Sequence, residues 1–174
     1  LGNIVHKILQ EFHEKNLSGK NEINRLLIKH WDSKLYFYKC ESNQYFLDAK
    51  DMLENYCMYL KNNIPSPVLF ETFFRINMNK YILSGVIDRL DIDKDGNIKI
   101  YDYKTSASQK SESKIHNSFQ LPIYALAIYL DGEKLDSKIR NRLSPIAVSE
   151  LSLRFDDMEK SIELYKDDIE EIDR

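Results

Sequence analysis

The stretch from residue 85 to residue 106 constrains the fold of this chain more than any other part of the sequence. It reads GVIDRLDIDKDGNIKIYDYKTS, and apolar and polar residues alternate on both sides of a Lys-Asp-Gly turn at 94–96. Alternation with a period of two is typical of β-strands, and glycine readily adopts the left-handed conformation that a three-residue hairpin turn requires. The sequence therefore predicts an antiparallel hairpin in which Asp93 pairs with Asn97.

The register of this hairpin has a chemical consequence. Counting outward from the turn sets Ile92 opposite Ile98. Four residues further along each strand, Asp88 comes opposite Asp102. Cross-strand partners share one face of a sheet, so two carboxylates meet there. Like charges in this position are destabilising unless a cation, a proton or open solvent relieves them.

A lysine extends this charged face. Lys104 lies two residues after Asp102 and therefore points to the same side of the strand. A carboxylate and a lysine at the end of an apolar stripe suit a hydrolytic metal site, because oxygens hold a hard cation and an ammonium can orient the attacking water. An exposed strand end with an ordinary Asp–Lys pair is the alternative, and the spacing alone leaves both open.

The same stretch also matches a second motif. Its acidic positions fit the calcium-binding loop of an EF-hand, apart from an Asp at the twelfth position where a Glu is usual. The matching acids are Asp91, Asp93, Asp95 and Asp102, and Gly96 occupies the glycine position of that loop. An EF-hand loop is flanked by two helices, whereas the flanking residues here alternate like strands. A calcium-binding module is therefore a competing hypothesis, and a turn rich in Asp and Gly is the simpler interpretation.

Hydrophobic spacing predicts the elements around the hairpin. Helical spacing predicts three amphipathic helices, over 1–15, 22–31 and 43–60. Alternation predicts strands over 68–78, 82–92, 98–105 and 146–155. Two further helices are expected over 118–130 and 156–174. Pro122 is compatible with the first turn of its helix, and Gly132 is a plausible stop signal. The expected fold is α/β (α+β), with the order α-ααβββαβα.

Length and composition indicate one globular domain. The chain has 174 residues, which can bury a core without disulfides or structural metals. It begins inside a predicted helix without an initiator Met, so we expect residues 1–174 to be a single domain from a longer protein. It has neither a secretory signal nor an apolar run of about 20 residues, so we expect a cytoplasmic protein without a membrane segment.

The charge is unevenly distributed. The net charge is −3, but residues 156–174 hold nine acidic and three basic side chains, so the rest of the chain carries +3. Residues 104–142 hold seven basic and four acidic side chains, and Lys110 and Lys114 are among the basic ones. This modest bias could follow a DNA strand, and scattered surface lysines are the alternative.

Five short motifs occur in order along the chain. They are G-x-x-x-H at Gly2 and His6, a strand glutamate at Glu71, G-x-I-D-R at 85–89, D-Y-K-T at 102–105 and Q-L-x-x-Y at Gln120 and Tyr124. Each is weak alone, but together they resemble the PD-(D/E)XK nuclease superfamily, in particular its RecB-like branch, over nearly the whole chain. The resemblance implies a restriction-endonuclease-like core, with a mixed central sheet flanked by helices.

The resemblance also implies a metal site. Asp88, Asp102 and His6 would bind one or two divalent ions, Mg²⁺ or Mn²⁺, together with the main-chain carbonyl of Tyr103. An imidazole ligand favours Mn²⁺ over Mg²⁺, so stronger activity with Mn²⁺ is expected. The alternative is that His6 is a surface histidine.

Further catalytic and DNA-binding residues follow from the same resemblance. Lys104 would position the water that attacks a DNA phosphodiester. Glu71, which alternates with Leu69 and Phe73 on the predicted strand, would help to hold the metal or the lysine. Gln120 and Tyr124 lie one helical turn apart and would contact the phosphate backbone or the lysine.

Alternatives remain for some of these positions. Tyr124 could instead pack in the core with Leu121 and Ile128. Cys40 and Cys57 match neither a CxxC pattern nor the four-cysteine frame of the cluster-bearing relatives. We therefore expect reduced, mostly buried thiols and no iron–sulfur cluster.

The functional expectation is a metal-dependent DNA nuclease. It would be an exonuclease of recombination or repair, linked to a helicase domain or subunit. No Walker A motif occurs in this chain, so any helicase activity would belong to another part of the polypeptide or to another subunit. Two other functions stay open at this point. One is the calcium-binding module, and the other is a nuclease fold that binds DNA without cleaving it.

Overall fold

The computed structural model describes residues 1–78, 80–116, 118–140 and 145–172. These residues form two compact units, which we describe one at a time. The helical unit comprises Leu1–Pro65, Tyr103–Gln109 and Ser152–Met158. The sheet unit comprises Ser66–Asp102, Lys110–Leu151 and Glu159–Arg174, apart from the undescribed residues.

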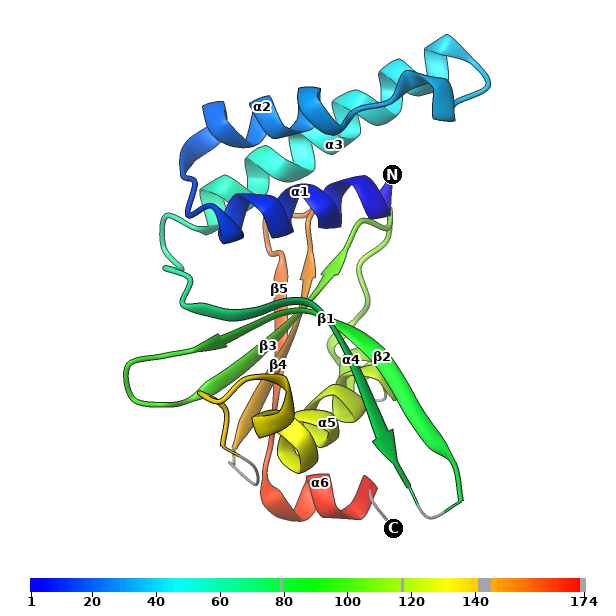
Figure 1. Cartoon of the computed structure of the whole chain (residues 1–174). Coiled ribbons are helices and arrows are strands. Elements are labelled where there is room, and N and C mark those ends of the chain that lie inside the picture. The colour runs from blue at the N-terminus through cyan, green and yellow to red at the C-terminus, as the bar shows by residue number, and fades with distance from the viewer. Residues whose placement is uncertain (79, 117, 141–144, 173–174) are drawn as a thin grey trace. The chain divides into compact units, whose positions relative to one another are not determined.

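Three helices build the helical unit (Figure 1). They are α1 (Gly2–Glu14), α2 (Gly19–His30) and α3 (Lys39–Tyr59), with a short 3₁₀ turn, η1 (Ser33–Leu35), before α3. All three expected helices are confirmed, although α2 and α3 begin earlier than the apolar spacing indicated. Helix α1 packs on α2, and α2 packs on α3. The core of this unit includes Val5, Leu9, Ile23, Leu27 and Leu53, which are fully or almost fully buried.

The sheet unit is built around a mixed five-stranded sheet. Its strands are β1 (Pro67–Asn77), β2 (Ile82–Ile92), β3 (Ile98–Lys104), β4 (Ile146–Ser152) and β5 (Glu159–Leu164). They lie in the order β1-β2-β3-β4-β5, and the pairs β1·β2, β2·β3 and β4·β5 are antiparallel. The last two residues of β3 and the last of β4 are grouped with the helical unit.

Helices complete the sheet unit (Figure 1). They are α4 (Glu112–His116), α5 (Gln120–Leu135) and α6 (Lys166–Ile172). Helix α5 packs against β1, β2 and α6. Its apolar residues, such as Ala125 and Ile128, share one buried cluster with Ile87, Leu90 and Ile100 of the sheet. The expected α/β fold, with a mixed sheet flanked by helices, is confirmed. None of the described helices has the length and apolar character of a membrane span.

The predicted hairpin is confirmed in its turn and its register. Gly96 has a φ of +86°, and the Asp93 amide donates to the Asn97 carbonyl over 3.1 Å. Ile92 pairs with Ile98, as expected. The Asp93 carboxylate accepts hydrogen bonds from the Asp95 and Asn97 amides at 2.8 and 2.9 Å, which stabilises the turn. The flanking segments are the strands β2 and β3, so the helix–loop–helix of an EF-hand does not form here.

The prediction for the acidic segment 156–174 was wrong. A strand, β5, and a short helix, α6, replace the single helix that was expected. Ile162 pairs with Val148 and Leu164 pairs with Ile146, so β5 adds an edge strand to the sheet. Pairing with β4 outweighs the helical spacing, which is a local signal only.

Two smaller differences concern the region before β4. Helix α5 continues beyond Gly132 to Leu135 through a kink at Asp131. A Cβ at Gly132 would lie 2.4 Å from the Ile139 side chain, so this glycine permits close packing and is not a stop signal. The expected loop at 106–113 runs into the additional helix α4.

The cysteines also differ in part from expectation. Cys40 is exposed, whereas Cys57 is buried as expected. Burial raises the pKa of the Cys57 thiol to about 11, so this thiol stays protonated at neutral pH.

Glu71 interrupts the alternation of β1. Its φ is +39°, which is unusual for a residue with a side chain. Leu69 is buried on one side of it, but Phe73 is 61% exposed on the other and Phe74 is buried instead. The prediction that these three odd-numbered positions share a face was therefore wrong, because the alternation of buried and exposed residues changes phase between Leu69 and Phe73. A conformation with positive φ costs on the order of 1–3 kcal/mol, and it occurs most often at functional sites.

The positive φ at residue 71 predicts that glycine is tolerated better than alanine at this position, the reverse of the usual order in a strand. Glu71→Gly should be more stable than Glu71→Ala by about 1 kcal/mol, because glycine adopts a positive φ without a steric penalty. The free energy of unfolding, measured by urea denaturation, tests this. The matched control is Phe73, an exposed position of the same strand, where Phe73→Gly should be less stable than Phe73→Ala. The same order at both positions would contradict the account.

Candidate metal centre

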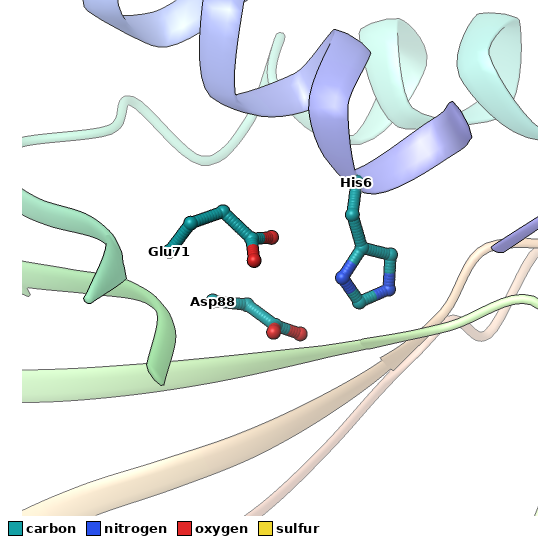
Figure 2. A group of neighbouring side chains, drawn as sticks. All are labelled: His6, Glu71 and Asp88. Carbon is teal, nitrogen blue, oxygen red and sulfur yellow. The ribbon is translucent and has the colours of Figure 1, made fainter. Parts of the chain in front are cut away.

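Three carboxylates come from neighbouring strands of the sheet unit. Glu71 lies on β1, Asp88 on β2 and Asp102 on β3. Asp88 and Asp102 are 7% and 3% exposed, whereas Glu71 is half-buried. Oxygen atoms of Glu71 and Asp88 lie within 4.8 Å of each other, and Figure 2 shows the two carboxylates side by side.

The β2–β3 register relates the second pair. The paired positions end at Arg89 and Tyr101, and Asp88 and Asp102 are the next residues along the two strands. Two buried acids in this relation repel each other when both are ionised, and a hard cation relieves that repulsion.

Helix α5 places two polar side chains over these acids. The Gln120 amide donates to Asp102 Oδ1 at 3.3 Å and to the Tyr124 hydroxyl at 2.6 Å. Both residues lie at the start of α5, four positions apart and on one face. The structure thus brings together Asp102, Gln120 and Tyr124.

The Tyr124 side chain has an apolar and a polar end. Its ring packs edge-on against Phe74, with 5.9 Å between ring centroids, as the core-packing alternative expects. A Cβ at Gly85 would lie 2.9 Å from the Phe74 ring and 3.6 Å from the Tyr124 ring, so this motif glycine makes room for both.

The hydroxyl of Tyr124 is held in its protonated form. The pKa of Tyr124 is raised to about 12, mainly by burial and also by the charges of Asp102, Asp88 and Glu71, while the hydrogen bond from Gln120 opposes this effect. At neutral pH this phenol can therefore donate a hydrogen bond to an anionic ligand.

The helical unit contributes a second set of donor atoms. His6 Nε2, on α1, lies 3.1 Å from the main-chain oxygen of Tyr103. His6 is also drawn in Figure 2. In an octahedral site with ligand distances of about 2.1 Å, neighbouring donor atoms are about 3.0 Å apart. The separation of these two atoms therefore fits two adjacent ligands of one ion.

The donor types in both units suit the same class of metal. Carboxylates and a carbonyl are the usual ligands of Mg²⁺ and Mn²⁺, and an imidazole adds preference for Mn²⁺. The residues present therefore fit a divalent cation of this class. A cationic side chain, Lys104, is half-buried at the end of β3.

The two expected DNA-binding lysines differ in their surroundings. Lys114 is exposed on α4. Lys110 forms an ion pair of 2.7 Å with Glu150, a β4 carboxylate that is only 3% exposed. A phosphate would have to compete with this buried acid for Lys110. The sequence analysis did not single out Glu150, because strand alternation does not reveal that β4 is buried on both faces.

The arginine of the G-x-I-D-R motif is buried and bound to neighbouring side chains. Arg89 is 1% exposed, and its Nε lies 2.8 Å from an Asp91 carboxylate oxygen. Its guanidinium also lies over the Tyr101 ring, 3.9 Å from the centroid. Arg89 thus ties β2 to β3 next to Asp88. Burial raises the pKa of Asp91, while Arg89 opposes this effect.

Two further polar residues escaped the sequence analysis. His13 and Tyr56 are buried in the helical unit, and their side chains contact each other at 2.6 Å. Tyr56 in turn contacts the Tyr103 hydroxyl at 3.0 Å. Nothing in the local spacing of these residues indicates the contacts, because they join positions more than 40 residues apart.

Comparison with known proteins agrees with this geometry. None of the curated proteins compared with the chain matches it. The family model of the PD-(D/E)XK nuclease superfamily matches residues 1–173, which include all three carboxylates, Lys104 and the Gln120–Tyr124 pair. A match over the whole chain, together with a mixed sheet that carries these acids on adjacent strands, leads to one conclusion: the chain belongs to the PD-(D/E)XK nuclease superfamily.

Proposed function

We propose that this protein is a divalent-metal-dependent DNA nuclease that hydrolyses phosphodiester bonds. Within that class we propose an exonuclease of the RecB-like branch, acting in recombination or repair together with a helicase domain or subunit. One observation carries the proposal. Buried acids on adjacent strands lie beside a glutamine and a protonated tyrosine, in a chain of a nuclease superfamily.

The acids and the histidine have distinct proposed roles. Asp88 and Asp102 bind the cation, and Glu71 assists them. The peptide bond joins Asp102 directly to Tyr103, whose carbonyl oxygen lies beside His6 Nε2. On this connection we base the proposal that the Tyr103 carbonyl and His6 are further ligands of the ion.

The other side chains act on water and phosphate. A bound divalent cation would lower the pKa of a water molecule and neutralise charge that develops on the phosphate. Lys104 orients the attacking water. The Tyr124 hydroxyl, which accepts a hydrogen bond from Gln120, is free to donate its own proton toward a phosphate oxygen. Lys114 contacts the DNA backbone, and Lys110 does so when it leaves Glu150.

The full acidic set argues against a nuclease fold that only binds DNA. Such a site would have no need for buried acids opposite each other, since these repel DNA as well as one another. A strained backbone at Glu71 points the same way, because strain is retained where it serves a function.

The first test is cleavage of end-labelled single- and double-stranded DNA in Mn²⁺. The wild type should degrade at least one of these two substrates. The cleavage rate of Asp102→Asn should be at least about 100-fold lower, because the substitution removes a charged metal ligand worth several kcal/mol. Asp93→Asn is the matched control, since Asp93 is an exposed acid of the hairpin turn.

The label also tests the finer proposal. Release of mononucleotides from one end indicates an exonuclease and gives its polarity, whereas internal fragments indicate an endonuclease. Equal rates for wild type and Asp102→Asn would refute the proposed site, and so would a wild type that cleaves neither substrate.

A second prediction concerns metal preference. The wild type should cleave faster in Mn²⁺ than in Mg²⁺ at equal concentration, and His6→Ala should lose this preference because an imidazole ligand favours Mn²⁺. Lys7→Ala, an exposed neighbour on α1, is the control. If the wild type showed no gain in Mn²⁺, or if His6→Ala kept the full rate, His6 would not be a ligand.

A further inference from the structure

A chain of three buried polar side chains runs through the helical unit to strand β3. His13 Nε2 lies 2.6 Å from the Tyr56 hydroxyl, and that hydroxyl lies 3.0 Å from the Tyr103 hydroxyl. The three residues are 6%, 0% and 4% exposed, so water does not compete for these contacts. We call this chain of contacts the His13 relay.

The rings of the relay also fix one another sterically. The rings of His13 and Tyr56 meet edge to face, with 5.7 Å between centroids. Tyr56 and Tyr103 meet in the same way at 5.6 Å. Edge-to-face contacts on both sides of Tyr56 leave little freedom for the orientation of the Tyr103 ring.

Helix α1, which carries His13, also contacts Tyr103 through His6, nearer the start of the helix. His6 and His13 are seven residues apart on α1, so they lie two turns apart on one face. His6 contacts the Tyr103 carbonyl, and its ring meets the Tyr103 ring edge to face at 5.9 Å. Helix α1 therefore reaches Tyr103 twice, directly through His6 and through Tyr56 from His13.

We propose that His13 and Tyr56 are positioning residues that hold the Tyr103 carbonyl and His6 in the geometry required for metal binding. This inference rests on the proposed function, which makes the Tyr103 carbonyl and His6 metal ligands. Outer-shell hydrogen bonds of this kind orient the ligands, and their loss typically lowers metal affinity 10- to 100-fold.

The hydroxyl groups of Tyr56 and Tyr103 distinguish a positioning role from apolar packing. Phenylalanine at position 56 would fill the same space without the cost of burying a polar group. Buried hydroxyls at both Tyr56 and Tyr103, satisfied by each other and by His13, contribute a defined orientation in addition to apolar packing.

Tyr56→Phe provides the central test, because it removes one oxygen atom and keeps the ring. Mn²⁺ binding to the protein without DNA is measured by electron paramagnetic resonance of the free ion. The Kd for Mn²⁺ should rise about 10-fold or more. The cleavage rate at saturating Mn²⁺ should return close to the wild-type rate. Tyr45→Phe, a partly exposed tyrosine of the same helix, is the matched control and should bind like the wild type.

Two variants at His13 separate the loss of a hydrogen bond from misfolding. His13→Gln can still hydrogen-bond to Tyr56, whereas His13→Leu cannot. Circular dichroism establishes that each variant is folded. Gln should preserve most of the Mn²⁺ affinity that Leu loses, and equal affinity in both folded variants would overturn the inference.

The outcomes separate this inference from the proposed function. A wild type that binds Mn²⁺ and cleaves DNA, with an unchanged Kd in folded Tyr56→Phe, overturns the relay alone. A wild type that neither binds Mn²⁺ nor cleaves DNA overturns the proposed function and the relay with it.

Discussion

The pairing of β2 with β3 is the constraint on which the rest of this structure depends. Its paired positions run from Ile92–Ile98 to Arg89–Tyr101, and Asp88 and Asp102 come next along the two strands, where both are almost completely buried. Two buried carboxylates on neighbouring strands repel each other when both are charged. A divalent cation would relieve this repulsion, because it compensates the charges and uses the oxygens as ligands. The proposed metal ion would therefore stabilise this part of the sheet.

Other polar residues of the sheet unit lie next to these two aspartates. Glu71 brings a third carboxylate next to Asp88 at the expense of an unfavourable backbone conformation. Gln120 directs an amide donor at Asp102, and Tyr124 remains protonated beside the acids. These features come from three strands and one helix of the sheet unit, so the site is a property of the folded sheet and not of one motif.

Local signals in the sequence predicted the hairpin and its consequences. A glycine turn defines the register, and the register determines which side chains are opposite each other, so the pairs from Ile92–Ile98 to Arg89–Tyr101 could be predicted without a structure. The first three helices were predictable for the same reason, because amphipathic spacing is local. Long-range contacts were not predictable: β5 forms through its pairing with β4, Gly132 is explained by Ile139, and the His13 relay joins segments far apart in the chain.

A crystal structure of the protein soaked in Mn²⁺ would test the central claim most directly. Anomalous scattering locates the ion independently of any assumption about ligands. The account predicts a peak at the carboxylates of Asp88 and Asp102. A peak at the Asp93 turn, with none at the paired acids, would contradict it.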